Sequence, residues 1–102
     1  MLTLYLYSLL AGMLLANGTP HFVKGITGEQ HQTPFGRPSS AVVNVAWGWA
    51  NFIVAALLLH FAHPWPHLYR ASALFALGVL LMALFLAWAW SQHPENNTSK
   101  KR

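Results

Sequence analysis

Three long apolar runs restrict the fold of this chain more than any other feature. They span Met1–Ala16, Ala41–Ala62 and Ala71–Trp90, and none of them contains Asp, Glu, Lys or Arg. A helix that crosses a bilayer needs about 20 mostly apolar residues, and two of the runs reach that length. Only 8% of the 102 residues are charged, whereas soluble domains carry about 25%. The sequence therefore predicts an all-α membrane protein, a single membrane domain with three transmembrane helices.

The stretch between the first two runs has a different composition. Between Asn17 and Ser40 there are seven Gly or Pro residues, a density that favours a loop over a helix. Phe22 and Phe35 give it apolar contacts that a flexible linker would lack, so we expect a folded loop, and its entry into the membrane is left open. The residues around Ala16 resemble a signal-peptidase site, but the start has no cationic segment before it, which favours a retained helix. The expected boundaries are a helix at about 1–17, a Gly/Pro-rich cytoplasmic loop at 18–40, a helix at 41–62, an outer turn at 63–70, a helix at 71–90 and a disordered tail at 91–102.

The cationic residues predict the orientation of the three helices. Cationic loops remain on the cytoplasmic side of a membrane. Lys24 and Arg37 lie in the first loop, three more cations lie in the tail at 100–102, and the outer turn carries only Arg70. We therefore expect the N-terminus outside and the C-terminus in the cytoplasm. The net charge of +4 is scattered, which fits contact with anionic lipid better than binding of nucleic acid.

Small and polar residues recur along one face of each of the first two expected helices. Ser8, Gly12 and Ala16 are spaced by four residues, a spacing that lets helix backbones approach closely in lipid. Two asparagines follow at seven-residue spacing in the second helix, in the segment Asn44-x-x-Trp47-Gly48-x-x-Asn51. This second stripe is interpreted either as a helix-packing face or as the polar lining of a pore. The third helix offers only a shallow face of Ala76, Ala83 and Ala87.

Histidines are the candidate ligands of the chain. His60 and His63 could share a helix face and hold a metal ion, although no carboxylate lies nearby in the sequence. The segment around His60, with Ala56 one turn earlier and Pro64-Trp65 after it, resembles the antenna polypeptides of purple bacteria, which implies a tetrapyrrole ligand. No catalytic motif is present. We therefore expect no enzymatic activity, no metal and no cofactor, with a tetrapyrrole at His60 as the alternative.

A longer segment, from residue 17 to residue 51, resembles a group of small bacterial inner-membrane proteins that have no assigned function. The shared pattern covers about a third of the chain, and its residues are Asn17-Gly18-x-Pro20-His21-Phe22, Gly25-x-x-Gly28, Thr33-Pro34-Phe35, Ser39-Ser40 and Val43-Asn44-x-x-Trp47-Gly48. The resemblance implies a multi-pass protein of the bacterial inner membrane with about three helices. It brings no activity, but it directs attention to the first loop and the start of the second helix.

The functional prediction that follows is a small accessory or scaffolding subunit. Such a protein would pack within a larger membrane complex or form a homo-oligomer, with the lipid bilayer and another membrane protein as its partners. The first alternative is a small oligomeric transporter or channel lined by Asn44, Trp47 and Asn51. The second is a tetrapyrrole-associated subunit of a photosynthetic or respiratory complex, with His60 as the ligand.

Overall fold

Three long helices make up most of the protein in the computed structural model, which describes residues 1–92. The described residues are 80% helical, which confirms the all-helical prediction. The elements in order are α1 (Leu2–Ile26), β1 (His31–Thr33), β2 (Gly36–Ser39), α2 (Ala41–Ala62), a 3-10 turn η1 (Trp65–His67) and α3 (Leu68–Ser91). Each of the three α-helices is long and apolar enough to cross a membrane. The predicted tail, with its three cations, lies outside the described residues from position 93 onward.

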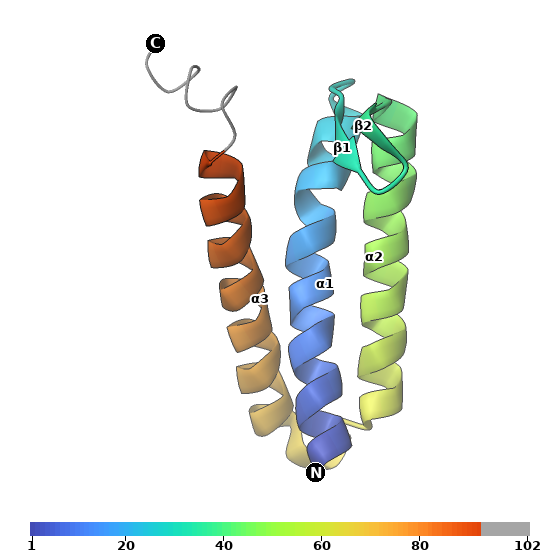
Figure 1. Cartoon of the computed structure of the whole chain (residues 1–102). Coiled ribbons are helices and arrows are strands. Elements are labelled where there is room, and N and C mark those ends of the chain that lie inside the picture. The colour runs from blue at the N-terminus through green and yellow to red at the C-terminus, as the bar shows by residue number, and fades with distance from the viewer. Residues whose placement is uncertain (93–102) are drawn as a thin grey trace.

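Helix α1 is the central element, because α2 and α3 both pack on it and make almost no contact with each other (Figure 1). The N-terminus lies at the end of the molecule where η1 joins α2 to α3. The two strands form an antiparallel hairpin at the opposite end, over the end of α1 and the start of α2. We refer to residues 31–39 as the hairpin. Helix α3 leans away from α1 toward its C-terminal end.

The first helix is longer than predicted, and the expected loop at 18–40 is correspondingly shorter. Helix α1 continues through Pro20 to Ile26. Membrane helices tolerate proline where side chains and neighbouring helices satisfy the freed backbone groups. The glycines that indicated a loop are contact points instead: a Cβ at Gly18 would lie 2.7 Å from the Asn51 Cβ, and one at Gly25 would lie 2.7 Å from the Ala41 carbonyl oxygen. Their small size lets α2 approach the last turns of α1.

The second helix has the predicted boundaries, and both of its ends have a local cause. The Ser40 hydroxyl accepts a hydrogen bond from the Val43 backbone N–H at 3.2 Å, which caps the first turn. His63 follows the helix in the left-handed conformation, with φ of 51°, and Pro64 comes next, so the helix cannot continue. Helix α3 then begins at Leu68, three residues before the predicted start at Ala71.

The interface between α1 and α2 follows a seven-residue repeat. In α1 the buried residues Leu4, Ala11, Gly18 and Gly25 are spaced by seven. In α2 the buried residues are Asn44, Gly48, Asn51, Ala55 and Ala62, and successive members are four, three, four and seven residues apart. A seven-residue repeat keeps two helices in contact when they cross with a left-handed twist. The stripe predicted on α2 is therefore its face toward α1.

The interface between α1 and α3 depends on two glycines. A Cβ at Gly12 would overlap the carbonyl oxygen of Phe75, and a Cβ at Gly78 would overlap the carbonyl oxygen of Leu9. The two helices therefore touch backbone to backbone near their middles. The shallow alanine face noted on α3 is not the face toward α1, because Ala76, Ala83 and Ala87 are all exposed. The buried residues of α3 are Ala71 and Gly78.

Candidate binding site beneath the hairpin

Two polar pairs join α1 to α2 at the hairpin end. Asn17 Nδ2 donates a hydrogen bond to Asn51 Oδ1 at 3.1 Å, and Asn51 Nδ2 donates to the Trp47 carbonyl oxygen at 2.9 Å. One turn farther along α1, His21 Nδ1 lies 2.9 Å from Asn44 Oδ1. Both asparagines of α2 are buried, so the amide groups noted in the sequence find their hydrogen-bond partners within one molecule.

The surroundings of Asn44 assign the tautomer of His21. Asn44 Nδ2 faces three backbone carbonyl oxygens, those of His31 at 3.0 Å, Ser39 at 3.2 Å and Ser40 at 2.9 Å. Carbonyl oxygens only accept hydrogen bonds, so the amide nitrogen must face them and Oδ1 must face His21. Because Oδ1 also only accepts, His21 Nδ1 carries the proton. In the neutral ring Nε2 is then left with the lone pair.

The same amide attaches the hairpin to the helices. Asn44 is fully buried and holds carbonyl groups from β1 and from the residues around the end of β2. Within the hairpin the hydroxyls of Thr33 and Ser39 share a hydrogen bond. On its outer side the ring of Phe35 meets Trp47 edge to face, with centroids 5.4 Å apart. The loop predicted from the Gly/Pro content is therefore an ordered cap.

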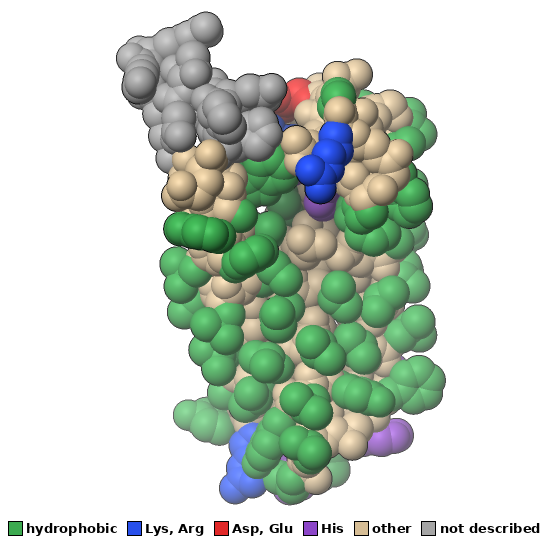
Figure 2. All heavy atoms as spheres, viewed as in Figure 1, with side chains coloured by type: hydrophobic (Ala, Val, Ile, Leu, Met, Phe, Trp, Pro, Cys, Tyr) green, Lys and Arg blue, Asp and Glu red, His purple; other side chains and the backbone are tan. Residues whose placement is uncertain are grey.

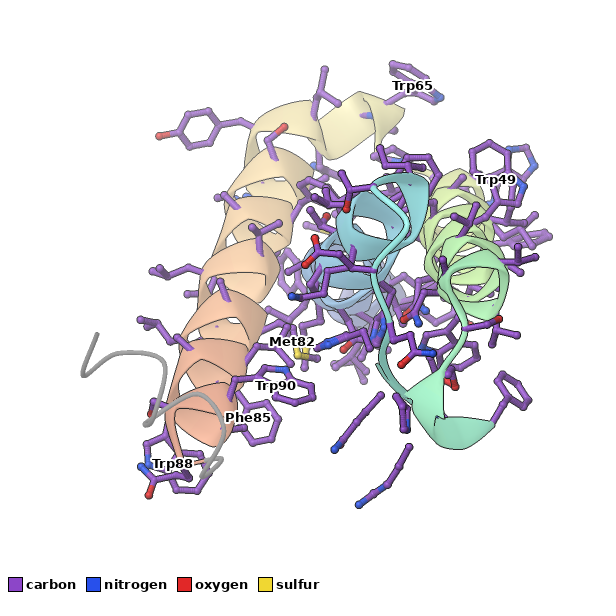
Figure 3. All side chains as sticks on the ribbon, turned by 90° about the horizontal axis from the view of Figure 1, so that it is seen from above. Trp49, Trp65, Met82, Phe85, Trp88 and Trp90 are labelled. Atoms are coloured by element: carbon purple, nitrogen blue, oxygen red, sulfur yellow. The ribbon has the colours of Figure 1, made fainter. Side chains whose placement is uncertain are left out.

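His31 connects the hairpin to both flanking helices. Its ring lies 4.9 Å from the His21 ring on α1 and 4.4 Å from the Trp90 ring on α3, measured between centroids. Figure 3 shows Trp90 pointing from α3 toward α1, whereas Trp88 points away. Burial, with the charges of His21 and Lys24 adding to it, lowers the pKa of His31 from 6.5 to about 4. His31 is therefore neutral at pH 7.

A cavity of about 380 Å³ opens beside these residues, and we call it the hairpin pocket. Its lining comes from α1, the hairpin, α2 and α3: Asn17, His21, Gln32, Thr33, Pro34, Arg37, Trp47, Leu86 and Trp90. Asn17, His21 and Pro34 belong to the loop pattern noted in the sequence and line this pocket. Gly18 and Phe22 belong to the same pattern but pack against α2. The pocket thus combines a cation, amide and imidazole groups with an apolar wall of indole and leucine side chains.

A second cavity, of about 460 Å³, lies between α2 and α3 at the other end of the molecule. His60 lines it together with Ala56 and Trp65, which are the residues of the antenna-like segment. His63 is exposed at the end of α2 and is not among the lining residues. Within residues 1–92 no three His, Asp, Glu or Cys side chains gather closely enough to hold a metal ion.

The remaining packing residues lie on α1 and α2. Ser8 is fully buried, and its hydroxyl has no hydrogen-bond partner within the described part of the chain. Gly12 meets α3, Ala16 is half-buried, and Gly48 meets α1, where a Cβ would lie 2.8 Å from the Gly18 carbonyl oxygen.

Sequence reasoning did not identify Gly78, Trp90 or the role of His31. An isolated glycine inside an apolar helix is a signal for close helix contact, so Gly78 could have been found. The contacts of His31 and Trp90 join segments far apart in the chain and carry no local signal.

No protein-family model matches this chain, and no curated protein or solved structure shows significant similarity to it.

Proposed function

We propose that this protein is a small integral membrane subunit that packs against another transmembrane helix, in a larger complex or in a homo-oligomer of the bacterial inner membrane. The observation that carries the proposal is the open groove between α2 and α3, which barely touch each other. Its lining residues include the small side chains of Ala56, Ala71 and Ser72. Lipid supplies no hydrophobic drive for helix association, so small residues and polar atoms mark the faces where helices meet.

A substitution that fills the groove tests this role. Ser72→Trp places a large side chain in the groove, whereas Leu77→Trp enlarges an exposed position of α3 outside its lining. Tagged protein extracted in mild detergent is analysed by size-exclusion chromatography and mass spectrometry. We expect the unmodified chain and Leu77→Trp to retain a stoichiometric partner or a second copy, and Ser72→Trp to lose it. A stable monomer with no partner in all three samples contradicts the proposal.

The proposed orientation, with the N-terminus outside and the C-terminus in the cytoplasm, rests on charge. Lys24 and Arg37 lie at the hairpin end, and Arg70 lies at the other end. Because the chain has no cysteine, single variants can report on each end. A membrane-impermeant maleimide added to intact spheroplasts should label His67→Cys and spare Glu29→Cys, and the reverse pattern contradicts the orientation.

The structure bears on the transporter or channel alternative through the two asparagines. Their amide groups are buried and hydrogen-bonded inside one molecule, which supports a packing role over the lining of a path between copies. The double variant Asn44→Leu, Asn51→Leu distinguishes the packing role from the lining role. A packing role predicts altered assembly, whereas a lining role predicts intact assembly and lost flux.

One observation favours the tetrapyrrole alternative as a second candidate. His60, Ala56 and Trp65 line the same largely apolar cavity, and an imidazole in such a cavity is a suitable axial ligand. A visible absorption spectrum of the extracted protein tests it, because the bare chain absorbs only through Trp and Tyr. A visible band that disappears in His60→Leu supports this candidate, and a colourless sample opposes it.

A further inference from the structure

The cations at the hairpin end have no counter-ion within residues 1–92. Lys24 and Arg37 form no ion pair there, and the nearby carboxylate of Glu29 accepts a hydrogen bond from the Thr27 hydroxyl at 3.0 Å instead. Figure 2 shows basic side chains at the two ends of the molecule and apolar side chains over the flank between them. The hairpin end thus carries a net positive charge beside a cavity.

The hairpin pocket has the mixed character that an amphiphile requires. Arg37 and Gln32 line it from the hairpin, while Trp47, Leu86 and Trp90 supply apolar surface from the helices. A guanidinium group binds phosphate oxygens through two parallel hydrogen bonds, so Arg37 suits a phosphate group. A small soluble anion would make no favourable contact with the apolar wall, whereas the acyl chain of a lipid would.

The cavity also has an apolar neighbour. A hollow of about 120 Å³ is lined by Leu14, Ala50 and Val54, together with Asn51 and Trp47. Trp47 lines this hollow and the hairpin pocket alike, so one indole separates a basic cavity from an apolar one. The hollow lies nearer the middle of α1 and α2, in the direction that an acyl chain takes from its headgroup.

The length of α1 places the hairpin end at the level of the lipid headgroups. Its 25 residues at about 1.5 Å each extend roughly 37 Å, longer than a hydrocarbon core of about 30 Å. The last turns of α1 and the hairpin then lie among the headgroups, where Lys and Arg meet anionic lipid. Trp88, exposed near the end of α3, is a residue type typical of this level.

We propose that the hairpin pocket is a binding site for an anionic phospholipid, with the phosphate group at Arg37 and one acyl chain passing Trp47 toward the hollow at Leu14 and Val54. This inference rests on the membrane insertion of the chain but not on its role as a subunit. The net charge of the site selects a headgroup with net negative charge, such as phosphatidylglycerol, over a zwitterionic headgroup such as phosphatidylcholine.

The test is a lipid titration of the purified full chain in mild detergent, followed by native mass spectrometry. Phosphatidylglycerol and phosphatidylcholine with identical acyl chains are the two lipid probes, and glycerol 3-phosphate is the soluble one. Arg37→Gln removes the phosphate ligand, and Arg70→Gln removes a cation from the opposite end as the matched control. Leu86→Trp narrows the pocket without changing the charge.

We expect one phosphatidylglycerol to be retained and phosphatidylcholine to be lost. Arg37→Gln and Leu86→Trp should each weaken lipid retention about fivefold or more; for Arg37 this corresponds to the roughly 1 kcal/mol that a cation near the surface contributes. Arg70→Gln should change lipid retention by less than about twofold, because Arg70 lies at the opposite end. Equal retention of both lipids, or an unchanged titration for Arg37→Gln, overturns the proposal. Glycerol 3-phosphate bound as tightly as the lipid would assign the pocket to a soluble phosphate and also overturn it. Helical circular dichroism of each variant verifies the fold, and loss of a protein partner in the pull-down leaves these outcomes unchanged.

Discussion

The two faces of α1 hold their neighbouring helices by different means. Toward α2, side chains bridge the interface through the Asn17–Asn51 and His21–Asn44 pairs. Toward α3, the backbones themselves touch at Gly12 and Gly78. The hydrogen bond found between α1 and α3 side chains, from Arg70 to Tyr5, lies at the far end from the hairpin.

This difference has a consequence for the shape of the molecule. The polar pairs lie near the hairpin and fix how the hairpin, α1 and α2 meet, because each amide and imidazole must face its partner. The glycine contact holds α3 near its middle, and the last turns of α3 diverge from α1, as Figure 1 shows. The hairpin pocket opens where these two modes of contact meet, with Arg37 on the hydrogen-bonded side and Leu86 on the divergent helix.

The largest expected effect comes from enlarging the glycine contact. Gly78→Leu must push the Leu9 carbonyl away, and a backbone group cannot move aside as a side-chain tip can. Overpacking typically costs about 1–3 kcal/mol, and we expect this change at or above the upper end. Thermal unfolding in detergent measures it, and Ala83→Leu, at an exposed position of the same helix, is the control. Equal stability of the two variants would show that α3 does not depend on backbone contact.

Loss of the central amide ranks next. Asn44→Leu leaves the His21 Nδ1–H and the carbonyl oxygens of His31 and Ser39 without their partner. An unsatisfied buried polar group costs about 1–3 kcal/mol, and the hairpin amides should exchange faster with deuterium, as hydrogen-exchange mass spectrometry can show. Asn51→Leu should affect the hairpin less, because the Asn51 amide forms its hydrogen bonds with Asn17 and Trp47, which lie on the helices. Unchanged hairpin protection in Asn44→Leu would contradict the role assigned to this amide.

The same contrast between the two faces separates what the sequence could predict from what it could not. Apolar length alone predicted three helices, and the stripe of Asn44, Gly48 and Asn51 indicated the buried face of α2. Glycine was misread because it has two uses: it supplies turns in water and close contacts in lipid. Gly18 and Gly25 were assigned to a loop, although α1 continues through both as a helix.

The contents of the site depended on contacts between segments far apart in the chain. His21 was identified as a candidate, but its tautomer follows from Asn44, and the orientation of Asn44 follows from carbonyl groups of the hairpin. The ring of Trp90 reaches His31 only because α3 returns past the hairpin. No local periodicity contains that information, so the sequence could indicate polar residues but not the pocket that they form.

Acid should weaken the attachment of the hairpin. The pKa of His31 is about 4 when the hairpin is docked, compared with 6.5 for a histidine in water. Between these two pH values the undocked hairpin therefore binds more protons than the docked hairpin. The docked state is therefore fully favoured above pH 6.5 and loses stability as the pH falls toward 4. Hydrogen exchange of the hairpin amides at pH 7 and pH 5, corrected for intrinsic exchange, measures this. His31→Gln should remove most of this pH dependence, and an unchanged pH profile in that variant would contradict the role assigned to His31.

The smallest effect is expected at the polar contact between α1 and α3. Tyr5→Phe removes the hydroxyl that accepts from Arg70 Nη1 at 3.1 Å, and this bond is exposed. Exposed polar contacts contribute about 0.2–1 kcal/mol, so the midpoint of thermal unfolding should change little. Tyr7→Phe is the matched control, because both tyrosines pack on the same cluster of Leu4, Ala62 and Ala71. If Tyr5→Phe destabilised the protein as much as Gly78→Leu, α3 would be held by its polar end, and the contrast between the two faces of α1 would be wrong.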